Sequence, residues 1–128
     1  MRFICRLDRS IYSCVTEHIA SDAVVITEKQ AAHIFENHPQ REHADVIARL
    51  SDIVRSPDYI LRDDDPRIAV VLKSFQIDGV RYRVILKLAS AEDQAHACNS
   101  ILTAFFISGK KMAKYLRNKK VLYRRPGI

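Results

Sequence analysis

The chain has 128 residues, a formal net charge of +6 and 48% hydrophobic residues. This length suits one domain, here residues 1–128, and the hydrophobic fraction is large enough for a packed core, which argues against disorder. With three glycines and four prolines, long flexible linkers are not expected, and no apolar run is long enough to span a membrane. No signal peptide is seen, and Cys5, Cys14 and Cys98 lack metal-ligand spacing, so we expect reduced thiols in a cytoplasmic protein.

The positive charge is concentrated at the C-terminal end of the chain. Asp93 is the last acidic residue, and eight Lys and Arg residues follow it, whereas residues 1–93 carry 13 basic and 15 acidic residues. A neutral-to-acidic body with a basic end indicates a surface for a polyanion. A solvated basic tail would have the same composition, so charge alone leaves both interpretations open.

The N-terminal part of the sequence favours short strands. Alternating or β-branched residues predict strands at 3–7, 11–15 and 23–26. We interpret residues 1–26 as a strand-like extension that precedes the helices of the same domain.

Two helices are expected to follow these strands. Thr27 and Gln30 match a capping box, which predicts a helix that begins there. This helix should end near His38, because Pro39 disfavours helical geometry in the residue before it. A second helix is indicated by an apolar stripe with helical spacing at Val46, Ile47, Leu50, Ile53 and Val54.

The second half of the chain is expected to form an antiparallel meander. Asp78-Gly79 is the favoured dipeptide of a two-residue hairpin turn, and Ser108 can cap a short helix that runs to Arg117. Residues 89–98 form a polar loop in this interpretation. Strands are predicted at 59–61, 68–75, 80–88, 100–107 and 120–124.

Two helices followed by hairpin-linked strands predict an α+β domain whose helices cover one face of the sheet. The other face would be available for binding. On the strand at 80–88, apolar residues point one way, and Arg81, Arg83 and Lys87 point the other way. Three cations without an acidic neighbour on that strand indicate an anion site, although an ordinary solvated sheet face also alternates in this way.

Many catalytic chemistries find no support in the sequence. Walker, Rossmann, GxSxG and HExxH patterns are absent, and the acidic run 63–65 is better explained as a solvated turn, so we expect no metal and no cofactor. His33 and His38 are five residues apart and make a poor pair of metal ligands on a helix. RNA carries its own nucleophile, the 2′-hydroxyl, which a protein can activate with His, Lys and Arg side chains alone.

Motifs along most of the chain add a further indication. They are LDRSIYSCVTEHI (7–19), VVITEKQAAHIFENHP (24–39), SPDYILRDDDPRIAVVLKSF (56–75), YRVILKL (82–88), NSILTAFFIS (99–108) and KYLRNKKVLYRR (114–125). Together they resemble the phage-type members of the barnase–EndoU–colicin–RelE nuclease superfamily; ITxxxxxHIxxxHP and YLRNKKxLYRR are the most specific patterns. The resemblance implies a barnase-like α+β fold, with N-terminal helices packed on a mainly four-stranded antiparallel sheet. It also implies metal-independent endoribonuclease activity of the toxin or phage-effector kind.

The resemblance also assigns site residues. The family's polar positions fall on His33, His38, Lys87, Asn99, Ser100, Thr103, Arg117 and Tyr123. The expected catalytic residues are His33, His38, Lys87, Ser100 and Thr103, with His33 as general base or acid and Lys87 stabilising the phosphorane. Tyr123 is expected to stack on a base. The expected nucleic-acid-binding residues are Arg81, Arg83, Asn99, Lys110, Lys111, Lys114, Arg117, Lys119, Lys120, Tyr123 and Arg124.

One conflict arises within this set. Strict strand alternation sends Ser100 and Thr103 to opposite faces of the sheet, because they are three residues apart. A regular strand that begins after Ser100, a bulge between the two residues, or a structural role for one of them would resolve the conflict.

The sequence therefore predicts a metal-independent endoribonuclease whose products carry a 2′,3′-cyclic phosphate and a 5′-hydroxyl. RNA, such as tRNA or mRNA, is the expected partner, and an antitoxin or immunity protein is a further partner to consider. A non-catalytic RNA- or DNA-binding module and a phage effector that acts through protein–protein contacts are the alternatives.

Overall fold

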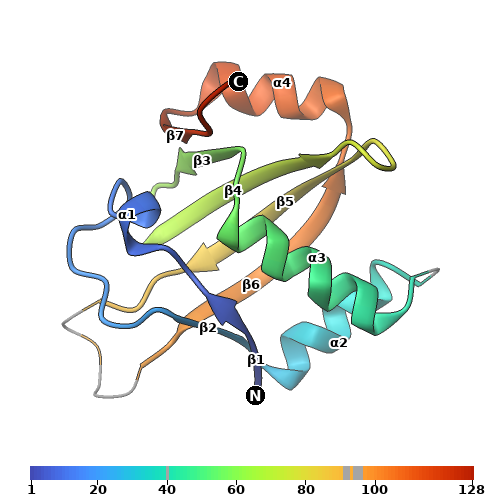
Figure 1. The fold of residues 1–128 in the computed structure, drawn as a ribbon, viewed down its shortest axis with the longest axis horizontal. Helices are drawn as coiled ribbons and strands as arrows, with labels where there is room; N and C mark the ends of the chain where they lie inside the picture. Colours follow the sequence, from blue (N-terminus) through green and yellow to red (C-terminus); the bar gives the residue numbers. More distant parts are fainter. Residues whose placement is uncertain (40, 91–92, 94–96) are drawn as a thin grey trace.

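The computed structural model describes residues 1–39, 41–90, 93 and 97–128. Within these residues, four helices pack around one mixed seven-stranded sheet (Figure 1). The strand order is β1-β2-β6-β5-β4-β3-β7, and neighbouring strands are antiparallel except for the parallel pair β2 and β6. In chain order, the elements are β1 (Arg2–Arg6), α1 (Arg9–Tyr12), β2 (Ala23–Ile26), α2 (Glu28–Glu36), α3 (His43–Arg55), β3 (Tyr59–Arg62), β4 (Ile68–Phe75), β5 (Val80–Lys87), β6 (Asn99–Ile107), α4 (Gly109–Asn118) and β7 (Val121–Arg124).

The expected barnase-like arrangement, with N-terminal helices on a mainly four-stranded antiparallel sheet, is wrong. The chain begins with strands, because β1 and β2 pair with each other and extend the sheet before α2 begins. β2 also pairs with β6 in the parallel direction, with Val24 beside Asn99, and this pairing makes the sheet mixed. Residues 1–26 thus supply two strands and α1 to the same sheet and core.

A short helix replaces the strand that alternation predicted at 11–15. Asp8 caps this helix, α1, because its carboxylate accepts a hydrogen bond from the backbone N–H of Ser10. Tyr12 is fully buried and donates its hydroxyl proton to the Val54 carbonyl at 2.8 Å. The cap and this long-range hydrogen bond stabilise a helical turn where the apolar pattern alone favoured a strand.

The sequence signals of α2 and α3 are confirmed. Thr27 and Gln30 form a reciprocal capping box, and α2 ends at Glu36, two residues before His38. The apolar stripe of α3 packs inward, and Leu50 and Ile53 belong to the main core cluster. None of the helices in the described ranges is long and apolar enough to cross a membrane.

The two faces of the sheet are covered differently. The main core lies where α2 and α3 pack on the side to which Val84 and Leu86 of β5 point; we call this side the helix-covered face. A smaller cluster on the opposite side joins α4 to Leu61, Val70 and Leu72 of β3 and β4. We call the β5–β6 part of this second side the open face. Its side chains are exposed or half-buried, apart from Ile107 at its end.

The connection between β4 and β5 is longer than predicted. Phe75 pairs with Val80, so four residues, 76–79, join the strands, and the two-residue turn predicted at Asp78-Gly79 is wrong. The backbone N–H of Gly79 donates to the Phe75 carbonyl at 2.8 Å, and Gly79 has a φ of 70°, which glycine adopts without strain. In the expected polar loop at 89–98, residues 91, 92 and 94–96 lie outside the described residues.

Burial of Cys5 in β1 predicts a slow reaction with alkylating agents. Desolvation raises the pKa of the Cys5 thiol from 9.0 to about 11, so at pH 8 the folded protein holds almost no Cys5 thiolate. Iodoacetamide should therefore modify Cys5 far more slowly in the native protein than in urea, as measured by mass spectrometry of digested samples. Equal rates in the two conditions would show that Cys5 is not buried.

Candidate nucleic-acid interface

A row of cations follows the outward side of β5. Strand alternation places Arg81, Arg83, Ile85 and Lys87 on the open face, while their neighbours along the strand fill the core. Arg81 and Lys87 are exposed, and Arg83 is half-buried. The predicted alternation of this strand is confirmed, and it puts three positive charges on one side of a central strand.

A β-bulge in β6 brings Ser100 and Thr103 to the same face. The strand register pairs Lys87 with Ser100 and Ile85 with Thr103, which leaves one extra residue of β6, Leu102, between the two pairs. Residues that lie directly opposite each other on neighbouring strands share a face. The bulge therefore resolves the conflict in the sequence and places both hydroxyl groups beside the β5 cations.

Arg83 lies at the centre of the open face. Its Nη1 donates to the Tyr115 hydroxyl at 2.6 Å, and its guanidinium carbon lies 5.3 Å from the centroid of the Phe105 ring. The Arg83 Nε and the Thr103 Oγ1 are both buried and lack hydrogen-bond partners in the structure. None of the ion pairs between described residues involves Arg83. A guanidinium held by a hydroxyl and aromatic rings, without a carboxylate, is suited to bind an external anion.

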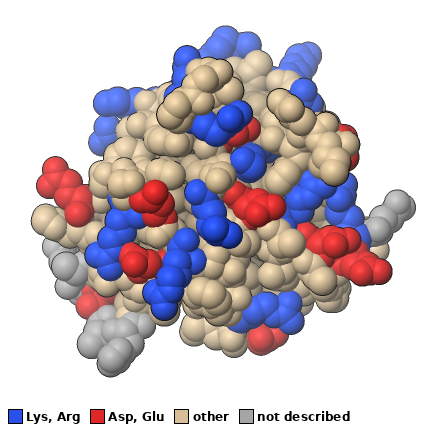
Figure 2. Space-filling model, in the orientation of Figure 1, with Lys and Arg blue, Asp and Glu red and all other residues tan. Residues whose placement is uncertain are grey.

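Helix α4 continues the positive surface beside Arg83. The helix contains no acidic residue, and its Lys111 ammonium lies 6.0 Å from the Tyr115 ring. A β-carbon at Gly109 would lie 3.2 Å from the Arg81 guanidinium carbon, which shows how closely Arg81 approaches the start of α4. Figure 2 shows Lys and Arg side chains along the upper edge, where α4 lies, and mixed charges elsewhere on that view. The exposed cations of the helix are Lys110, Lys111, Lys114 and Arg117.

Lys87 occupies a different environment at the far end of β5. It lines a pocket of about 310 Å³ together with Ser100, Cys98 and Asp93. The Asp93 carboxylate accepts from the Ser90 backbone N–H and pairs with a guanidinium at 2.8 Å, and these contacts lower the pKa of Asp93. The Asp93 charge partly offsets that of Lys87, so Arg83 is the stronger anion-binding group of the two.

The structure does not bring the predicted catalytic residues together. Lys87, Ser100 and Thr103 share the open face, but His33 is exposed on α2, on the other side of the sheet. His38 is only 3% exposed and also lies on the helix-covered side, with its ring 4.2 Å from the Phe106 ring. Neither His33 nor His38 therefore faces a phosphate in common with Lys87.

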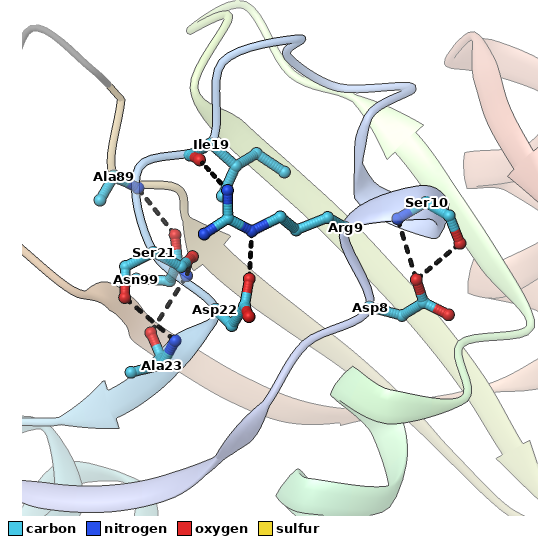
Figure 3. A network of polar contacts seen from close by, with 9 residues as sticks. All are labelled: Asp8, Arg9, Ser10, Ile19, Ser21, Asp22, Ala23, Ala89 and Asn99. Carbon is cyan, nitrogen blue, oxygen red and sulfur yellow. Dashed lines mark hydrogen bonds and ion pairs between the residues drawn. The ribbon is translucent and has the colours of Figure 1, made fainter.

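The Asn99 side chain hydrogen-bonds to backbone groups and does not reach the surface. The residue is fully buried, and its side-chain oxygen accepts from the Ala89 N–H at 2.8 Å (Figure 3). Its Nδ2 donates to the carbonyls of Ser21 and Ala23 at 2.6 and 3.0 Å. The amide thus ties the start of β6 to the start of β2 and to the residues after β5, and its burial leaves no surface for RNA.

Several C-terminal residues contact other parts of the protein and are therefore less available to bind RNA. Tyr123 packs against the main core, and the Arg124 guanidinium lies over a tyrosine ring, 5.8 Å from its centroid. Arg125 forms an ion pair at 2.9 Å with the buried carboxylate of Asp58. Lys119 and Lys120 line a pocket of about 330 Å³ with Asp63 and Asp64 of the acidic turn. Only the α4 part of the C-terminal cluster adjoins the open face without carboxylate neighbours in the described residues.

Two aromatic residues of this interface were missed in the sequence. Phe105 lies two residues beyond Thr103 on β6, so strand alternation could have placed it on the same face. Tyr115 lies four residues after Lys111, which is the spacing of neighbours on one side of a helix. The alternation assigns Phe105 to the open face only once the bulge has placed Thr103 there. The spacing assigns Tyr115 to the interface only once the packing side of α4 is known.

No other protein identifies this surface. No protein-family model matches the sequence, and no curated protein and no solved structure shows significant similarity to it. Among the described residues, no group of three or more His, Cys, Asp or Glu side chains is placed to hold a metal ion. The resemblance to phage-type nucleases stays a prediction.

Replacing Asn99 should weaken the fold without weakening RNA binding by the folded protein. Asn99→Ala leaves one buried N–H and two half-buried carbonyls without their side-chain partner, which should cost about 3 kcal/mol of unfolding free energy in urea titrations. Asn118→Ala, at an exposed position of α4, is the matched control and should change the free energy of unfolding by less than about 0.5 kcal/mol. A stable Asn99→Ala protein would contradict the structural role.

Proposed function

We propose that this domain binds RNA across the open face and the adjoining surface of α4. One observation carries the proposal: the half-buried Arg83 guanidinium has aromatic and hydroxyl neighbours but no carboxylate partner among the described residues. A guanidinium held in a sheet face in this way can bind an anion from outside. The cations of α4 extend the same surface and can follow a phosphate backbone.

The aromatic residues favour a single-stranded RNA over a duplex. Phe105 and Tyr115 flank the Arg83 guanidinium, so phosphate-binding and base-stacking groups lie side by side. Single strands are typically bound by such a combination, because their unpaired bases can stack on aromatic rings or on a guanidinium plane. The half-buried Ser100, which lines the pocket beside Lys87, adds a hydroxyl group that can bind phosphate or ribose.

Removing the Arg83 charge should weaken RNA binding in a salt-dependent way. Arg83→Gln should lower affinity for a single-stranded RNA and reduce the slope of log K against log salt by about 0.7 for one lost phosphate contact. Fluorescence anisotropy over a salt series measures both quantities. Lys29→Gln, an equal charge loss on exposed α2, is the matched control and should leave both unchanged. Equal losses in the two variants would place the RNA elsewhere.

Metal-independent RNA cleavage is a second candidate, and the contact between Arg83 and Tyr115 favours it. Tyrosine can transfer protons, and here its hydroxyl lies 2.6 Å from a guanidinium that can stabilise a phosphorane. The ribose 2′-hydroxyl would lose its proton to water and its oxygen would attack the adjacent phosphorus. The bond from phosphorus to the 5′-oxygen would break, and that oxygen would leave with the proton of the Tyr115 hydroxyl, which solvent would then replace. The products would carry a 2′,3′-cyclic phosphate and a 5′-hydroxyl. Neither histidine is needed in this form of the hypothesis.

Cleavage is tested by incubating the purified protein with total RNA in EDTA and mapping the ends that form. If Tyr115 transfers a proton, Tyr115→Phe should slow cleavage by about a hundredfold to ten-thousandfold while RNA affinity changes little, because the ring is retained. Binding without cleavage would leave a non-catalytic RNA-binding module. An absence of both binding and cleavage would remove the RNA hypothesis and favour a protein partner.

A further inference from the structure

A second cationic cluster lies on the helix-covered side, beneath the β4–β5 connection. Arg41, before α3, and Arg49, within α3, both reach the carboxylate of Asp78 in this connection, at 3.4 and 2.6 Å. Asp78 is thus the shared partner of two guanidinium groups, and the carboxylate of Asp52 is the other negative charge that acts on Arg49. The side chains of Asp78 and Arg41 are 30% and 31% exposed, so solvent reaches the contact.

Aromatic rings hold the two arginines in place. The Arg49 guanidinium carbon lies 4.2 Å from the centroid of the Phe75 ring, and that of Arg41 lies 5.4 Å from the centroid of Phe106. The Phe106 ring also contacts the ring of Tyr82, with centroids 4.9 Å apart. The guanidinium groups would therefore keep their positions if the Asp78 carboxylate moved away.

Two buried polar atoms beside these rings lack partners. The His38 Nδ1 lies 2.7 Å from the Ile34 carbonyl, which only a protonated nitrogen can satisfy, so the neutral ring leaves Nε2 as a hydrogen-bond acceptor. This Nε2 is buried and without a hydrogen-bond partner, as is the Tyr82 hydroxyl. Burial raises the pKa of Tyr82, so its hydroxyl remains a donor at neutral pH. Unpaired buried groups of this kind are rare in folded proteins.

We propose that this cluster is a second anion site, which binds a phosphate group that carries a neighbouring hydroxyl, as in a ribonucleoside 3′-phosphate. Arg41 and Arg49 bind the phosphate in place of the Asp78 carboxylate. Both buried atoms become accessible as Asp78 leaves and the ligand enters. The Nε2 of His38 then accepts a hydrogen bond from the 2′-hydroxyl, and the Tyr82 hydroxyl donates to a phosphate oxygen. Asp78 occupies the site in the absence of ligand and competes with it.

The chemistry of the donors and acceptors selects this ligand class. Two guanidinium groups that converge on one carboxylate can instead bind the oxygens of a phosphate, which carries more charge. A neutral imidazole acceptor fits a hydroxyl and not a phosphate oxygen, so phosphate alone leaves His38 unsatisfied. His38 and Arg41 contact the same ring, Phe106, which brings both within the span of one mononucleotide.

The test is a titration of the ¹⁵N-labelled protein, followed by NMR, with adenosine 3′-monophosphate, its 2′-deoxy analogue and inorganic phosphate. All three should shift the backbone amides at 78–80, because the Asp78 carboxylate leaves its place. The ribonucleotide should bind about threefold to tenfold more tightly than the deoxy analogue, the contribution of one hydrogen bond. Equal affinities, or shifts confined to β5 and β6 residues of the open face, would overturn the proposal.

Variants separate the parts of the site. Asp78→Asn removes the competing charge but keeps an oxygen that can accept from the Val80 N–H, so phosphate should bind more tightly. Arg49→Gln should weaken phosphate binding by tenfold or more, whereas Arg55→Gln at the exposed end of α3 should leave phosphate binding unchanged. His38→Asn keeps a side-chain N–H for the Ile34 carbonyl and should abolish the preference for the ribonucleotide.

Each result decides the matter. Unchanged or weaker phosphate binding by Asp78→Asn would show that the carboxylate does not compete. Unchanged binding by Arg49→Gln would show that the arginine does not hold the phosphate. These two variants leave His38 in place, so they remain decisive even if His38→Asn fails to fold.

Discussion

The division of β5 between two environments organises the rest of the molecule. Its alternate residues Tyr82, Val84 and Leu86 are buried under α2 and α3, and this apolar packing fixes which way the strand faces. Because the strand is central and paired along its whole length, Arg81 and Arg83 have no freedom to turn away from the opposite side. The open face is positive as a consequence of core packing, and the bulge in β6 then adds hydroxyl groups to it.

The sheet also separates the polar clusters from one another. The cations of the open face lie on one side of β5 and β6, and His38, Arg41 and Arg49 lie on the other side, with the sheet backbone between them. A ligand bound at one cluster cannot share its phosphate with the other. Each side combines arginines with aromatic rings, so both surfaces can hold guanidinium groups in fixed positions without a full set of carboxylates.

Local signals in the sequence predicted local structure well. The capping box at Thr27, the Ser108 cap and the alternation of β5 each depend on residues within one element, and each is confirmed. The parallel pairing of β2 with β6 could not be predicted, because it depends on Asn99 meeting backbone groups more than seventy positions earlier in the chain. A bulge between Ser100 and Thr103 was one of three alternatives that alternation allowed, and its position at Leu102 could not be predicted.

The candidate site was predicted only in part, because some of its features depend on residues within one strand and others depend on long-range contacts. The β5 cations could be assigned to one face from their spacing, whereas the sequence carried no sign that the buried amide of Asn99 is saturated by backbone groups. It also gave no sign that Arg125 pairs with Asp58, since these residues come together only when β7 joins β3. Tertiary pairing decides which members of a charged run stay available for a ligand.

The order of the strands has a consequence for how the chain reaches this structure. β3, β4, β5 and β6 follow one another in sequence and in space, so they can pair after closing comparatively short loops. The strands on either side of this meander join through distant partners, β2 with β6 and β7 with β3, and these pairings require much longer loops to close. The central meander can therefore form early in folding and serve as the template on which both ends of the chain assemble. The cationic strand would then be in place before either edge of the sheet is complete.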